Sequence, residues 1–164
     1  MLGQKLIVDQ ETYLGPIENL EQTTEAFVKW FNDPKIIEHM SVKLGRTTAE
    51  ETERLQRISG DDSRIDWIIY HNHQLIGCIT LKLNESIGEV GYEIGERNCW
   101  GKGIATACLK KVMEWVFDNT SLDIRTVEGK CSVNNVGSRK VLEKCGFEQK
   151  SIDDNQIVYE LEKK

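Results

Sequence analysis

The sequence predicts an α+β fold with a single mixed, mostly antiparallel sheet of about seven strands flanked by helices. Between residues 64 and 95, three segments rich in β-branched and aromatic residues follow one another with short turns, which is typical of an antiparallel meander. A glycine-rich turn, a helix pattern and a further strand come next, so at least one parallel crossover lies within the sheet. Because the chain shows no repeat, low-complexity tract or linker, residues 1–164 are expected to form one domain.

Local residue patterns set the ends of the predicted helices. Thr47 and Glu50 form a capping box that opens the third helix. Asn134 is the expected N-cap of the last helix, and Gly146 stands where a left-handed residue closes it. The predicted strands cover residues 12–17, 64–70, 75–83, 89–95, 124–131, 147–152 and 156–161, the predicted helices cover residues 18–32, 35–40, 47–58, 104–118 and 135–145, and residues 1–10 are expected to include a ragged end.

The composition is that of an ordinary globular protein and argues against several classes of function. The formal net charge of −6 disfavours nonspecific nucleic-acid binding and is compatible with a cationic acceptor such as an amine. No apolar run approaches the roughly 20 residues of a membrane span, and the N-terminus lacks the apolar core of a signal peptide. The five cysteines are odd in number and form no C-x-x-C pair, which favours a reduced, cytoplasmic protein. His71 and His73 flank a turn without further ligands at metal spacing, so no metal is expected.

The glycine-rich turn at residues 98–103 is the strongest candidate for a binding site. Gly101 and Gly103 let the backbone approach a ligand, and the free N–H groups and dipole of the following helix favour phosphate. From this stretch alone, a plain tight turn is an equally good interpretation. A P-loop does not fit because Gly103 follows Lys102, and a dinucleotide fingerprint does not fit because Thr106 replaces its third small residue.

The same turn resembles motif A of the GNAT superfamily of acyl-CoA N-acyltransferases, Gln/Arg-x-x-Gly-x-Gly/Ala. Its first position departs from the motif, since Asn98 stands there and Arg97 lies one residue early. The segment from Asn135 to Phe147 resembles motif B, Asn-x-x-Ser-x-x-Val-Leu-Glu-Lys-x-Gly-Phe, at every position. Together with the order of the elements, the resemblance covers nearly the whole chain and implies a GNAT fold whose sheet is splayed between its fourth and fifth strands. Segments 13–17, 30–34 and 100–106 make it most similar to the RimJ/RimL type, the ribosomal-protein N-terminal acetyltransferases and their relatives.

This resemblance implies acetyl-CoA as the donor and a primary amine as the acceptor. A protein N-terminus, a polyamine, an amino sugar or aminoglycoside and an amino acid all remain open as acceptors. The pyrophosphate would lie on the amides of residues 100–106, and the pantetheine arm would pair with the backbone of residues 94–96. The implied cofactor-binding residues are Ile94, Gly95, Glu96, Asn98, Trp100, Gly101, Lys102, Gly103, Ile104, Ala105, Thr106, Asn135 and Ser138.

The resemblance also suggests catalytic roles. It places Ser138 near the cofactor sulfur, where its hydroxyl can serve the thiolate, while a backbone N–H near Ile94 can hold the oxyanion. Glu93 is the candidate general base because it lies on the splayed strand, although a solvent-facing strand carboxylate is about as good an interpretation. Tyr92 is expected on the opposite face. The alternative function is a noncatalytic acyl-CoA sensor or interaction module, against which the presence of Asn135 and Ser138 argues. A homodimer is a family-level expectation.

Overall fold

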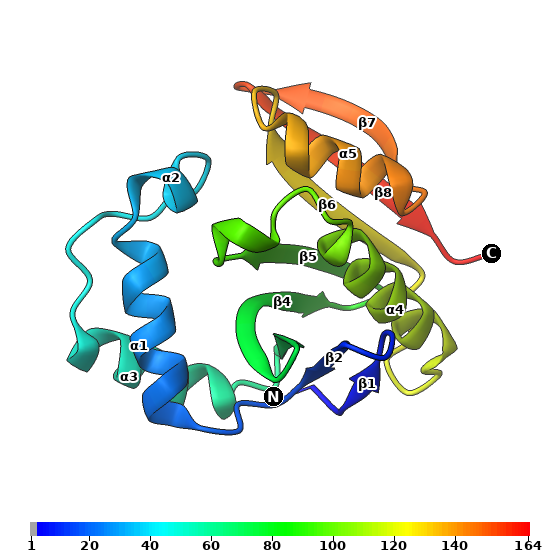
Figure 1. Cartoon of the computed structure of the whole chain (residues 1–164). Helices are drawn as coiled ribbons and strands as arrows, with labels where there is room; N and C mark the ends of the chain where they lie inside the picture. Colours follow the sequence, from blue (N-terminus) through cyan, green and yellow to red (C-terminus); the bar gives the residue numbers. More distant parts are fainter. Residues whose placement is uncertain (1–2) are drawn as a thin grey trace.

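The computed structural model of the chain describes residues 3–164 and consists of a central sheet with helices on both faces (Figure 1). The strands are β1 Leu6–Ile7, β2 Thr12–Gly15, β3 Arg64–His71, β4 Gln74–Asn84, β5 Ile87–Ile94, β6 Thr126–Ser132, β7 Glu148–Asp153 and β8 Gln156–Glu162. The helices are α1 Leu20–Phe31, α2 Pro34–Ile37, α3 Thr48–Ser59, α4 Ile104–Asp118 and α5 Val136–Lys144, with a short 3-10 helix η1 at Arg97–Cys99.

The eight strands form one sheet in the order β1-β2-β3-β4-β5-β6-β8-β7. Every neighbouring pair is antiparallel except β5 and β6, which run parallel. The predicted mixed, mostly antiparallel sheet is therefore confirmed. The additional strand is β1, which lies within residues 1–10, the segment expected to include a ragged end. Residues 1–2 of that segment lie outside the described residues.

Side chains alternate between the two faces of the sheet, and each face packs on different helices. On one face, Trp67 and Ile69 of β3 belong to a core that includes Leu109 and Val112 of α4. On the other face, Ile68 and Tyr70 of the same strand join a second cluster with residues of α1 and α2, whose members are Phe27, Trp30, Phe31, Ile36 and Ile37. Helices α4 and α5 therefore lie on one face, and α1 to α3 lie against part of the other.

The helix ends follow local chemistry, with one correction. The capping box at Thr47 and Glu50 is confirmed. The predicted N-cap Asn134 is wrong, because Asn135 caps α5 by accepting a hydrogen bond from the backbone N–H of Ser138 at 3.0 Å. Two asparagines stand side by side, and only Asn135 lies three residues before that free amide. Gly146 closes the helix as predicted, with a φ of 89°.

Strands β5 and β6 part after four paired positions. Their parallel register runs from Ile87 and Thr126 to Val90 and Gly129. Beyond that point β5 continues to Ile94 on β4 alone, and β6 continues to Ser132 on β8 alone. Residues Gly91–Ile94, here called the open edge of β5, thus lack β6 as a neighbour. This is the splay expected from the sequence.

None of the helices within residues 3–164 combines the length and the apolar character needed to span a bilayer.

Candidate active site at the open edge of β5

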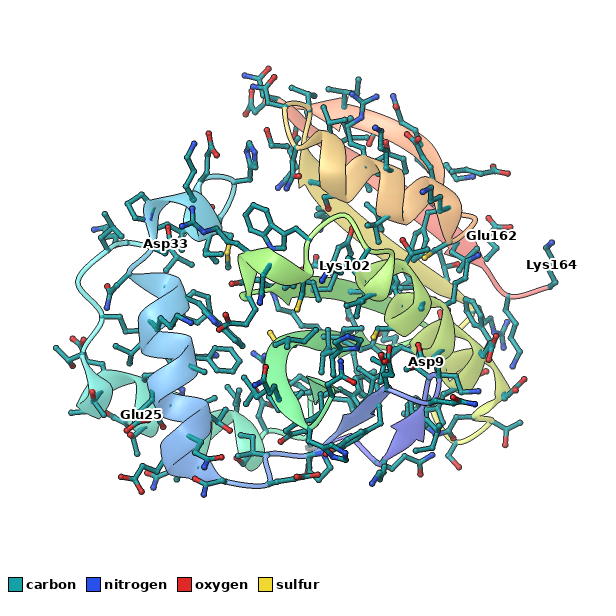
Figure 2. The ribbon with its side chains drawn as sticks, in the orientation of Figure 1. Asp9, Glu25, Asp33, Lys102, Glu162 and Lys164 are labelled. Atoms are coloured by element: carbon teal, nitrogen blue, oxygen red, sulfur yellow. The ribbon has the colours of Figure 1, made fainter. Side chains whose placement is uncertain are left out.

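The chain leaves β5 through η1 and makes a glycine turn before entering α4. Gly101 has a φ of 71° and Gly103 a φ of 77°, in the left-handed region that glycine adopts at little cost. A Cβ placed on either glycine would meet no other described atom within 4 Å, so the space above the turn is open. Figure 2 shows Lys102 on this turn and Asp33 on the nearby α1–α2 side of the molecule. The turn can therefore receive a bulky group close to its backbone.

The first turn of α4 presents its amides without a capping side chain. Its N-cap is Gly103, and within the described residues no side chain accepts a capping hydrogen bond there. The first turn also contains no acidic residue. Backbone N–H groups and the positive end of the helix dipole thus face the open space above the glycines, which suits an anion such as a phosphate. The chemistry and the space at this turn fit the pyrophosphate of an acyl-CoA.

Backbone groups at the end of β5 already have partners within the chain. The indole N–H of Trp100 donates to the carbonyl oxygen of Ile94 at 2.7 Å, although Trp100 is 46% exposed. The amides of Gly95 and Glu96 both donate to the carbonyl oxygen of Ile76, at 2.8 and 3.3 Å. No sequence pattern predicts these three bonds, which use backbone groups expected to pair with pantetheine.

The side chain of Glu96 ties the end of β5 to α1. One of its carboxylate oxygens accepts from Trp30 Nε1 at 2.9 Å and from Lys29 Nζ at 2.8 Å. Gly95 lies directly against the Trp30 ring, since a Cβ there would come within 1.9 Å of the indole. These contacts fix α1 on the strand that carries the candidate site.

Ser138 lies beside a tyrosine that sequence analysis did not assign to the site. The Tyr92 hydroxyl donates to the carbonyl oxygen of Ser138 at 3.0 Å and shares a second hydrogen bond of 2.8 Å with Ser138 Oγ. Burial raises the pKa of Tyr92 well above its usual value of 10.0, so the phenol stays protonated at neutral pH. The hydroxyl groups of Tyr92 on β5 and Ser138 on α5 thus lie together, and both can donate hydrogen bonds. Tyr92 lies on the face of the sheet opposite Glu93, as expected.

Glu93 lies on the opposite face of β5, where its carboxylate is largely withdrawn from water. Its Oε1 atom is buried and has no hydrogen-bond partner among the described residues. Burial raises the pKa of Glu93 to about 7, and the positive charges of Arg54 and Arg46 act against this rise. Glu93 therefore differs from an ordinary solvent-facing strand carboxylate in that one of its oxygens is withdrawn from water. A carboxylate with this pKa can accept a proton near neutral pH.

The remaining predicted residues lie on the glycine turn, at the start of α4 and at the N-terminus of α5. Asn98 and Lys102 are exposed, whereas the side chain of Ile104 is buried in the core and leaves only its backbone for a ligand. Asn135 uses its side-chain oxygen to cap α5. Within residues 3–164, no group of three or more His, Cys, Asp or Glu side chains is placed to hold a metal ion.

A mixed sheet that parts beside an uncapped, glycine-led helix is the arrangement that the resemblance to the GNAT acyltransferases implies. The family model described as "Acetyltransferase (GNAT) domain" matches residues 15–148, so the chain belongs to the GNAT acetyltransferase family. The chain is 25% identical over 139 residues to the "Uncharacterized N-acetyltransferase p20" of Bacillus licheniformis, covering 80% of this chain and 76% of that protein.

Two solved structures show the same fold at lower identity. The ribosomal-protein alpha-N-acetyltransferase RimL in complex with coenzyme A matches with a TM-score of 0.82 and 15% identity, over 97% of this chain and 98% of that one. The microcin self-immunity acetyltransferase MccE, in complex with acetyl-CoA and AMP, matches with a TM-score of 0.74 and 20% identity over 94% of each chain.

The unusual ionisation of Glu93 can be measured without any substrate. In a ¹³C NMR titration we expect the Glu93 carboxyl to change charge at about pH 7, whereas the ordinary pKa of a glutamate is 4.5. Glu89 is the internal control, because its hydrogen bond with Lys130 lowers the pKa of that carboxyl. Arg54→Met should move the Glu93 midpoint upward, since a positive charge that favours the carboxylate is lost. A Glu93 midpoint at the ordinary glutamate value would contradict this description of the site.

Proposed function

We propose that this protein is an acetyl-CoA-dependent N-acetyltransferase that moves an acetyl group to a primary amine by direct attack. The observation that carries the proposal is the arrangement along the open edge of β5. Glu93, one of whose carboxylate oxygens is buried without a hydrogen-bond partner among the described residues, lies on one face, and the Tyr92–Ser138 hydroxyl pair lies on the other. Direct transfer needs a base for the amine and a donor for the departing thiolate, and these groups supply both.

The donor's coenzyme A would be held by backbone more than by side chains. The amides of residues 100–106, which comprise Trp100, Gly101, Lys102, Gly103, Ile104, Ala105 and Thr106, would bind its pyrophosphate, with Asn98 beside it. Asn135, one helical turn from Ser138, would contact the cofactor at α5. The pantetheine arm would lie along the open edge, replacing the Trp100 indole at the carbonyl of Ile94. In this proposal the backbone of Ile94, Gly95 and Glu96 pairs with the pantetheine arm, as the resemblance implies.

In the proposed reaction Glu93 takes the proton of the attacking amine, directly or through a water molecule. A backbone N–H near Ile94 stabilises the oxyanion that forms as the carbon–nitrogen bond is made. The Ser138 hydroxyl turns its proton from Tyr92 toward sulfur as the carbon–sulfur bond breaks, and coenzyme A leaves as the thiolate. The acceptor is a small molecule or a peptide, and the cytoplasm is the expected location because the cysteines are free thiols.

Thiol release from acetyl-CoA with a panel of primary amines tests the proposal. We expect release that depends on both acetyl-CoA and one class of amine, with a stoichiometric N-acetylated product. Binding of acetyl-CoA without amine-dependent thiol release across the panel would instead support the noncatalytic sensor.

The glycine turn is tested by Gly103→Val. A β-branched side chain is strained at this φ and would occupy the open space where phosphate must approach, so acetyl-CoA affinity should fall at least tenfold in calorimetry. Gly45→Val is the matched control, because Gly45 also has a positive φ of 92° and an open surrounding but lies outside the turn. Equal affinities for the two variants would remove the turn from the binding site.

Ser138→Ala tests the donor to the thiolate. The Asn135 cap survives the change because it uses the backbone N–H of Ser138. We expect kcat and kcat/KM to fall together while acetyl-CoA affinity stays nearly constant, since sulfur gains charge only in the transition state. Ser151→Ala, on the exposed strand β7, is the control. A kcat within about twofold of wild type, roughly 0.4 kcal/mol, would show that the hydroxyl has no such role.

A further inference from the structure

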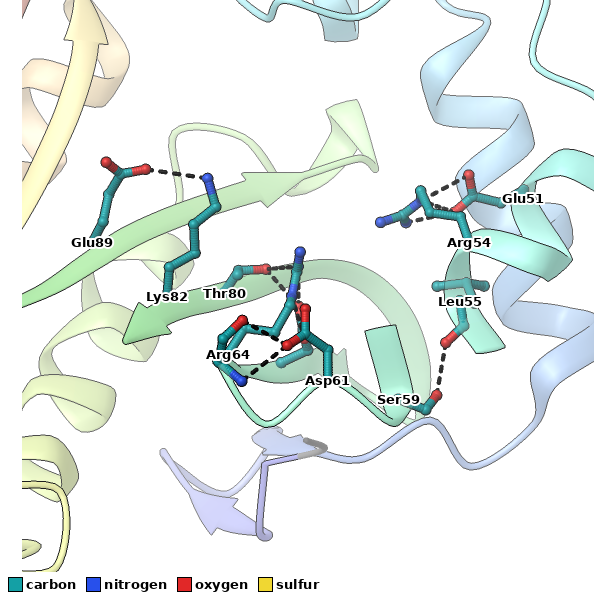
Figure 3. A network of polar contacts seen from close by, with 11 residues as sticks. Glu51, Arg54, Leu55, Ser59, Asp61, Arg64, Thr80, Lys82 and Glu89 are labelled. Carbon is teal, nitrogen blue, oxygen red and sulfur yellow. Dashed lines mark hydrogen bonds and ion pairs between the residues drawn. The ribbon is translucent and has the colours of Figure 1, made fainter. Parts of the chain in front are cut away.

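Two arginines share one buried carboxylate on the face of the sheet that carries Glu93. Glu51 of α3 is 0% exposed and accepts from Arg46 Nη1 at 2.8 Å. It also accepts from Arg54 Nε at 2.9 Å and from Arg54 Nη2 at 2.5 Å, as Figure 3 shows. We call Arg46 and Arg54 the arginine pair. Because both are held by a side chain from which water is excluded, their positions are fixed before any ligand arrives.

Some N–H groups of the arginine pair make no hydrogen bond within the described residues. Within residues 3–164, Arg46 Nε and Nη2 and Arg54 Nη1 make no hydrogen bond, since each guanidinium uses only its other nitrogens on Glu51. The side chains of Arg46 and Arg54 are also 23% and 24% exposed, so solvent reaches them. A fixed, partly open guanidinium with free N–H groups is suited to bidentate binding of a carboxylate or phosphate.

Aromatic packing places the arginine pair on the same face of the sheet as the candidate base. The Arg46 guanidinium lies 4.4 Å from the ring centroid of Phe31, and that of Arg54 lies 5.4 Å from that of Phe27. Cys78 packs against the apolar cluster that contains both rings, and it is the residue directly opposite Glu93 on β4. Both arginines also act electrostatically on the Glu93 carboxylate.

The arginine pair and Glu93 are separated in space. Two guanidinium groups share the single carboxylate of Glu51, so this ion-paired cluster keeps a net positive charge. Glu93, without a hydrogen-bonded partner, forms the negative side. A ligand that matches this pattern carries an ammonium and an anion close together. A polyamine would place a second positive charge toward the arginines, which is unfavourable.

We propose that the acceptor is a zwitterionic amine, in which a carboxylate or phosphate close to the amino group binds Arg46 and Arg54 while the amino group faces Glu93. This inference rests on the proposed acetyl transfer and narrows its acceptor class. The anion would fix the orientation of the amine before attack, so the arginine pair acts as a specificity-determining element.

Wild-type enzyme and matched acceptor pairs provide the first test. Thiol release would be compared for free amino acids against their α-amides, and for O-phosphoethanolamine against ethanolamine, with putrescine as the polyamine. Rates are compared at equal concentrations of the unprotonated amine, because the amino group has different pKa values in the anionic and the neutral member of each pair. We expect kcat/KM to be at least about tenfold higher for the anionic member of one series, which also identifies carboxylate or phosphate as the anion.

Arg54→Gln provides the second test. Measured at a pH where Glu93 is ionised in both enzymes, because loss of the Arg54 charge also moves the pKa of Glu93 upward, the change should raise KM for the preferred anionic acceptor about tenfold or more and leave KM for its neutral partner nearly unchanged. Arg57→Gln, an exposed position on the same helix, is the control. Arg46→Gln gives an independent variant if the first is unstable. Turnover that is equal within twofold for both members of every pair, or that favours putrescine, would overturn this inference alone. Absence of turnover with every amine would overturn the proposed function, and this inference with it.

Discussion

The short parallel pairing between β5 and β6 is the constraint on which the rest of the structure depends. These four paired positions join the sheet segment β1–β5 to the segment formed by β6, β8 and β7. Their limited length also leaves Gly91–Ile94 without β6 as a neighbour, although each strand still pairs on its other side. An open strand edge inside a protein is suited to receive an extended ligand as an added strand. The same register therefore holds the fold together and exposes the candidate site.

The open edge explains how groups from opposite faces of a sheet can serve one reaction. Consecutive residues of a strand point to opposite faces, so Tyr92 reaches Ser138 on α5 while Glu93 turns toward α1 and α3. In a fully paired sheet such groups would be separated by a neighbouring strand. Here they flank the same edge, and a bound thioester lying along it would have the proposed base on one side and the proposed hydroxyl donor on the other.

Sequence patterns were informative where the interactions are local and much less so where they join distant segments. The capping box at Thr47 and the closing Gly146 follow from chemistry within a few residues, and both were predicted correctly. The cap at Asn135 was missed by one position because adjacent asparagines carry equal propensity. The Tyr92–Ser138 contact spans 46 positions, and the burial of Glu93 depends on segments far away in the chain. No periodicity or motif encodes such contacts, although strand alternation did separate Tyr92 from Glu93.

Removal of the amine proton by Glu93 is tested most directly by the pH dependence of kcat/KM for wild type and Glu93→Gln. Catalysis needs the ionised carboxylate, so the wild-type rate should rise as pH increases through about 7, the pKa of Glu93. The acceptor amine adds its own ionisation in both enzymes. The Glu93→Gln variant should lose the rise in rate near pH 7, and its rate should fall by about 10²- to 10⁴-fold. A variant that keeps the wild-type rate and the limb near pH 7 would contradict the account.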